Sequence, residues 1–179
     1  LRLLRRAVDN GVPPGLVLAD QAYGSSRDFR KAVREMGLHY GVAVDPRSVV
    51  MVFDKVGRRR DEIISIIDLA HRIDKQGGFR RCTWRQGTKQ DLSARFALRR
   101  VVPAYDHAQG GIDKREPVWL LVEWRDNEVA PANCFLCSLP GRPTKKQLVR
   151  RVMQRWLQQT FLGSPCTVGE DRALTNLIL

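Results

Sequence analysis

The start of the chain alternates between short apolar runs and a segment with helical periodicity. Leu16–Ala19 and His39–Val44 are apolar runs of the length expected for buried strands. Between them, residues 27–36 place apolar side chains on one face and basic ones on the other, and Gly37 follows as a stop signal. A strand, a helix and a second strand in succession predict a βαβ unit with parallel strands over residues 16–44.

The rest of the chain shows two further kinds of pattern. Residues 1–10 are typical of the end of an amphipathic helix, and residues 63–73 predict a short helix. After residue 78 the apolar period becomes that of strands. The expected strands are 79–85, 95–105, 118–124 and 134–139. Thr144 is then a suitable cap for a helix that runs to residue 156.

Charge changes this picture more than composition does. The chain has 179 residues, enough for one good core, and its apolar fraction of 43% is ordinary for a globular protein. Its net charge of +12 favours an anionic partner, with nucleic acid ahead of a membrane, because no apolar segment is long enough to span a bilayer. A basic domain whose charges are simply solvated is the alternative. The densest basic surface is one side of the last helix, with Lys145, Lys146, Arg150, Arg151 and Arg155.

The cysteines and His39 indicate packing rather than chemistry. Cys134 and Cys137 form a C-x-x-C within an apolar run, and no second close pair completes a zinc site, so we expect buried thiols. His39 is expected to pack at a strand end. Isolated cysteines and the lack of a targeting segment at the start of this sequence lead us to expect a reducing cytoplasm.

Asp20 is the candidate for catalytic chemistry. It follows the apolar run Leu16–Ala19 and should lie at the carboxyl end of that strand, where open α/β sheets hold their active sites. A carboxylate at such an edge can hold a hard cation such as Mg²⁺. The structural alternative is that Asp20 caps a helix or forms a turn.

Several blocks of sequence, in order, resemble the DDE-type transposases of bacterial insertion sequences. The resemblance begins in the second-aspartate region, which comprises Gly11-Val12-Pro13-Pro14-Gly15 through Gly24, Phe29-Arg30 and residues 37–42. It continues through residues 84–89, 92–97, 115–124 and 145–150 and ends at Arg155-Trp156.

This resemblance implies an RNase H-like fold and DNA transposition. The fold class would be α/β, a partial RNase H-like core built on the βαβ unit, with a β-rich insertion and a C-terminal basic helix. Asp20 would be a catalytic acid and a ligand of Mg²⁺ or Mn²⁺, and the basic helix, including Arg155 and Trp156, would bind DNA at the transposon ends. The expected location is the bacterial cytoplasm, associated with the nucleoid, and the intact enzyme could form a homo-oligomer.

The sequence departs from the family at the acids. The third acid of the family would fall at Gln159, whose amide has no negative oxygen, and the strand with the first acid would precede Leu1. We therefore expect a fragment truncated at both ends and catalytically inactive as this chain. Two alternatives are a non-enzymatic DNA-binding module and a protein-interaction domain. The expected organisation is a partial core over 1–75, an insertion over 76–142, the basic core helix over 143–160 and a divergent tail over 161–179.

Overall fold

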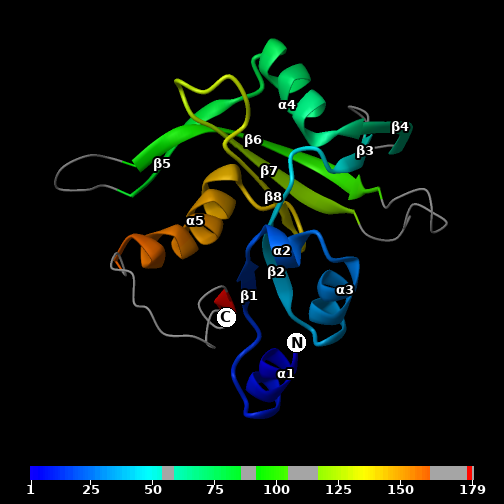
Figure 1. Cartoon of the computed structure of the whole chain (residues 1–179), viewed down its shortest axis with the longest axis vertical. Coiled ribbons are helices and arrows are strands. Elements are labelled where there is room, and N and C mark those ends of the chain that lie inside the picture. The colour runs from blue at the N-terminus through cyan, green and yellow to red at the C-terminus, as the bar shows by residue number, and fades with distance from the viewer. Residues whose placement is uncertain (54–58, 86–91, 105–116, 162–176, 179) are drawn as a thin grey trace.

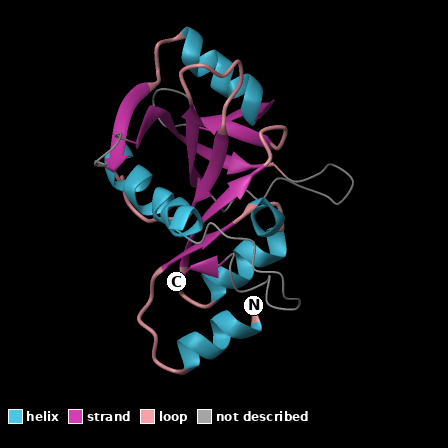
Figure 2. Ribbon diagram, turned by 60° about the vertical axis from the view of Figure 1, so that its left-hand side comes forward, coloured by secondary structure: helices cyan, strands magenta, loops and turns pink. Residues whose placement is uncertain are grey.

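The computed structural model places the strands of the chain in one mixed sheet with helices on both sides (Figures 1 and 2). It describes residues 1–53, 59–85, 92–104, 117–161 and 177–178, with the backbone alone over 59–61, 85, 154–161 and 177–178. In the described residues the strand order is β4-β3-β6-β7-β8-β2-β1-β9, and β5 pairs with β6. Helices α1 (Arg2–Asp9) and α4 (Ile66–Lys75) lie at opposite ends of the long axis (Figure 1).

The predicted βαβ unit is confirmed. Strands β1 (Leu16–Ala19) and β2 (His39–Val44) are parallel, and Leu16 pairs with His39. Helix α3 (Arg27–Glu35) connects them, and its amino terminus is capped by the Ser26 hydroxyl, which accepts a hydrogen bond from the backbone N–H of Phe29. A short helix that the periodicity did not predict, α2 (Gln21–Gly24), lies between β1 and α3.

The segment after β2 corrects one prediction. Strand β3 (Val49–Phe53) pairs with β4 (Arg59–Ser65), so residues 63–65, expected to be helical, belong to a strand. Helix α4 begins only at Ile66, because Ser65 is its cap and accepts a hydrogen bond from the backbone N–H of Asp68. Pairing with β3 satisfies the backbone groups of these residues, and local periodicity does not report that partner.

The strand-rich segment extends the same sheet. In its described residues the strands are β5 (Arg80–Arg85), β6 (Leu92–Pro103), β7 (Val118–Trp124) and β8 (Asn133–Cys137). They confirm the predicted strands, and β8 pairs antiparallel with β2. Strand β9 (Leu177–Ile178) pairs antiparallel with β1.

Two clusters of buried side chains hold the sheet between its helices. On one face, α1, α3 and α4 contribute Leu4, Phe29 and Ile66, among others, to the larger cluster. On the other face, α5 (Lys145–Phe161) buries Leu148 and Val152 against side chains of the strands. Alternation along each strand sends successive side chains to opposite clusters.

Candidate functional site

Asp20 lies at the carboxyl end of β1 and also caps α2. Its Oδ1 accepts hydrogen bonds from the backbone N–H groups of Ala22 at 3.1 Å and Tyr23 at 3.4 Å. The side chain is half-buried. The structure therefore combines the two interpretations that the sequence left open, an acid at the edge of the sheet and a helix cap.

Helix α2, which presents these N–H groups to Asp20, is fixed against β2. Gly24 approaches the strand so closely that an added Cβ would lie 1.8 Å from the backbone oxygen of Ala43. Arg30 of α3 is buried, and its Nη1 donates a hydrogen bond to the carbonyl oxygen of Gly24. Tyr23 and Phe29 pack with their ring centroids 5.1 Å apart. These contacts hold the backbone around Asp20 in one position.

A second carboxylate, Asp45, lies at the same edge of the sheet. It directly follows β2, and parallel strands end at the same side. Gln21 donates from Nε2 to Asp45 Oδ2 at 3.2 Å, which connects the residue after Asp20 to the end of β2. The Arg47 guanidinium, 2.7 Å from Asp45 Oδ2, lowers the pKa of this carboxyl to about 2 through hydrogen bonds and charge. Sequence analysis missed Asp45, although it follows a strand predicted to be parallel to the one before Asp20.

These residues do not fit a two-ion centre by themselves. Within the part of the chain that the structure describes, no three His, Cys, Asp or Glu side chains gather to hold a metal ion. Asp20 accepts hydrogen bonds from backbone N–H groups, and Asp45 is paired with Arg47. A pair of divalent ions needs more anionic oxygens than one capping aspartate offers. The side chain of Gln159 lies outside the described residues.

Helix α5 presents a basic exposed side. The Thr144 hydroxyl accepts the backbone N–H of Gln147, whose Oε1 in turn accepts the backbone N–H of Thr144, so the predicted cap is a reciprocal capping box. Lys146, Arg150 and Arg151 are exposed, and Lys145 is half-buried. Partial burial, together with the nearby positive charges of Arg80 and Arg99, lowers the pKa of Lys145, which the neighbouring Cys82 opposes. The side chains of Arg155 and Trp156 lie outside the described residues.

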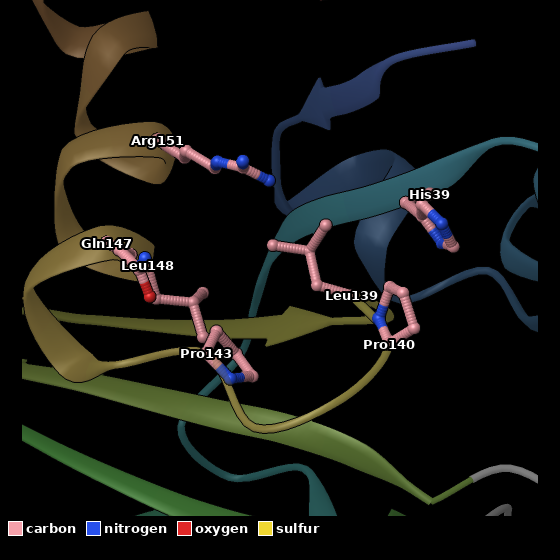
Figure 3. Close-up of a pocket in the computed structure, with 7 residues that line it drawn as sticks. All are labelled: His39, Leu139, Pro140, Pro143, Gln147, Leu148 and Arg151. Carbon is pink, nitrogen blue, oxygen red and sulfur yellow. The ribbon is translucent and has the colours of Figure 1, made fainter.

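The other candidates from the sequence, two cysteines and His39, lie at buried or half-buried positions. Cys134 and Cys137 of β8 are buried on opposite faces of the sheet, one in each core cluster, so they cannot bind one zinc ion together. Burial raises the pKa of both thiols, that of Cys134 to about 12. His39, the first residue of β2, is half-buried and lines a cavity of about 310 Å³ with Arg151 of α5 (Figure 3).

No described helix combines the length and apolar character that a membrane-spanning segment requires. The chain also contains three consecutive arginines, Arg58, Arg59 and Arg60. Arg58 and the side chains of Arg59 and Arg60 lie outside the described residues.

Comparison with known proteins gives one long match and several short ones. A family model described as DDE superfamily endonuclease matches residues 1–91. Hyaluronan synthase from Streptococcus pyogenes is 39% identical over 44 residues, 25% of this chain and 10% of that protein. Hyaluronan synthase 3 from Gallus gallus is 40% identical over 47 residues, 26% of this chain and 8% of that protein. These curated relatives are thus matched over a tenth of their length or less, and no solved structure matches.

The family match covers the elements on which the candidate site is built. Residues 1–91 include the parallel strands β1 and β2, the two helices α2 and α3 between them, and Asp20. Since the matched region is more than half of the 179 residues, this chain belongs to the DDE superfamily endonucleases.

Proposed function

We propose that this chain acts on DNA as part of a transposase-type DDE endonuclease with an RNase H-like core. The observation that carries the proposal is the position of Asp20. It lies at the carboxyl edge of a parallel strand pair, within the region that the family model matches. In this proposal Asp20 is one of the acids for Mg²⁺ or Mn²⁺, the DNA is a transposon end, and the protein works in the bacterial cytoplasm.

The chain's own contribution is to bind and position DNA. A net charge of +12 attracts a polyanion, and Lys146 and Arg150 on the exposed side of α5 can donate hydrogen bonds to phosphate oxygens. The buried side of α5 keeps that basic surface fixed to the sheet.

We further propose that this chain alone does not cleave DNA. The described residues bring no third metal-binding side chain to Asp20 and Asp45, and the amide of Gln159 carries no charge. Glu123 cannot substitute, because it is buried and accepts hydrogen bonds from Asn133 and Arg125. Cleavage would therefore need acids supplied from outside the described residues.

Binding and cleavage can be tested on the same purified chain. Fluorescence anisotropy of a labelled duplex between 50 and 200 mM salt should show affinity that falls steeply, by about 0.9 log units per log unit of salt for each phosphate contact. Lys146→Ala with Arg150→Ala should lower that slope by about 1.8, whereas Lys31→Ala with Lys75→Ala removes the same charge elsewhere and should leave it unchanged. A folded chain that does not bind DNA would contradict the proposed function.

Supercoiled plasmid with Mg²⁺ or Mn²⁺ provides the cleavage test. We expect no nicking above that of an Asp20→Asn variant, in which the asparagine keeps the helix cap. Nicking that disappears in Asp20→Asn would show that other acids complete the centre, and the proposal of inactivity would be withdrawn while the endonuclease assignment would be strengthened.

A further inference from the structure

Positive side chains also gather at the end of the sheet opposite to Asp20. Strand β2 begins there at His39 and β7 at Val118, and β8 ends there, because it is antiparallel to both neighbours. Two cavities of about 310 and 390 Å³ lie at this end and share His39, Leu139 and Pro140. The two cavities adjoin at these three residues.

Three arginines from three separate elements line these two cavities. Arg151 extends from α5 into the first cavity, across from His39 (Figure 3). Arg34 from the end of α3 and Arg100 from β6 line the second. None of the described residues that line either cavity is acidic. We call this set, Arg34, Arg100 and Arg151, the basic edge.

Arg100 is held in a defined orientation. Its guanidinium carbon lies 4.9 Å from the centroid of the Trp119 ring, on the neighbouring strand position. Stacking occupies the flat face of a guanidinium. Its N–H groups still point outward in the plane of the guanidinium and suit a bidentate contact with phosphate. Partial burial lowers the pKa of Arg100, and the positive charge of Arg34 lowers it further.

We infer that the basic edge binds backbone phosphates of duplex DNA, at a distance from the Asp20 edge set by the length of β2. This inference rests on the proposed function. A duplex is favoured over an acidic peptide because its phosphates form a regular array that can meet both ends of the sheet. Strand β2 has six residues, which span about 20 Å at ~3.3 Å per residue. Successive phosphates of one DNA strand advance by ~3.4 Å along the helix axis, so the basic edge would contact the duplex about six base pairs from a phosphate at Asp20.

The test compares two triple variants with the same loss of charge. Arg34→Gln, Arg100→Gln and Arg151→Gln together remove three phosphate contacts and should lower the salt slope by about 2.7. The ratio of wild-type to variant affinity for a 20-base-pair duplex should then shrink about 40-fold between 50 and 200 mM salt. The matched control, Arg72→Gln, Lys75→Gln and Arg81→Gln, lies on α4 and β5, lines neither cavity and should leave the slope unchanged.

Folding and specificity have their own readouts. Circular dichroism verifies that each variant is folded. If the triple variant is not, the single variant of the exposed Arg151 should still lower the slope by about 0.9. Replacing all three arginines by lysine should keep most of the slope but weaken binding, because lysine lacks the bidentate fork.

The outcomes separate this inference from the proposed function. An unchanged slope in the basic-edge variant, together with a lower slope in Lys146→Ala with Arg150→Ala, would overturn the inference and leave the proposed function intact. No DNA binding by the folded wild-type chain would overturn both. Polyglutamate and unlabelled duplex are compared as competitors at equal charge. If polyglutamate displaces the labelled duplex equally well, the site binds polyanions in general and the inference is overturned.

Discussion

Replacing Gly24 by alanine tests whether α2 is fixed against β2 as the structure shows. The new Cβ would lie 1.8 Å from the backbone oxygen of Ala43 and 2.9 Å from its carbonyl carbon, where real Cβ contacts essentially never fall below 3.0 Å. Relief therefore requires a shift of at least about 1.2 Å, the difference between 3.0 and 1.8 Å. Ala43 cannot move easily, because β2 is hydrogen-bonded between β1 and β8.

The cost of this overpacking can be estimated. Forcing one extra carbon into a packed site costs about 1–3 kcal/mol and occasionally more, and a clash with backbone belongs at the upper end. A loss of about 3 kcal/mol lowers the Tm of a chain of this size by about 6–12 °C. Moving α2 also displaces the N–H groups that donate hydrogen bonds to Asp20. Weakening this helix cap further lowers the stability of the variant.

The control is Gly37, where a positive φ and not a close contact favours glycine. Gly37 has φ of 73° and no atom within 4 Å of an added Cβ, so alanine there should cost only the left-handed backbone, about 1–2 kcal/mol. Thermal unfolding followed by circular dichroism compares both variants with wild type. If Gly24→Ala melts no lower than Gly37→Ala, α2 is not held against β2 and the reasoning is refuted.

Three further predictions concern single side chains. Asp20→Ala should lower the stability by about 1 kcal/mol and Asp20→Asn by much less, measured by thermal unfolding, because asparagine also caps a helix. The Asp45 carboxyl should titrate near pH 2 by NMR and move toward its usual 3.8 in Arg47→Ala. Since the folded pKa is lowered, the stabilising contribution of this ion pair is present above about pH 4 and is lost as the pH falls toward 2, so the stability difference between wild type and Arg47→Ala should vanish below pH 2. Iodoacetamide at pH 8 should modify Cys134 and Cys137 only after unfolding, since burial raises both thiol pKa values.

Local patterns were sufficient for the elements that carry their own signals. The strands 16–19 and 39–44 are apolar runs ended by Asp20 and by Asp45, and the helix between them has a serine cap and a glycine stop. The same holds for the capping box of α5 and for the strands of the later segment. These signals depend on neighbours in sequence, so they are visible without the fold.

Residues 63–65 show where local patterns fail. Their apolar spacing suits a helix, but β3 offers backbone hydrogen bonds across the sheet, and the helix begins only after the cap at Ser65. Pairing between strands joins residues that are distant in sequence, so a single periodicity cannot report it.

Some features of the candidate site follow from the sequence, and others depend on the fold. The sequence alone determined that Asp20 follows a buried strand, that α5 is basic on one side, and that the chain as a whole suits a polyanion. Only the tertiary structure showed that Gln21 connects Asp45 to the Asp20 edge, and that Arg34, Arg100 and Arg151 lie at the opposite end. The physical reason is that the direction and neighbours of each strand in the sheet decide which strand ends meet. A charged residue becomes part of a site only through that long-range pairing.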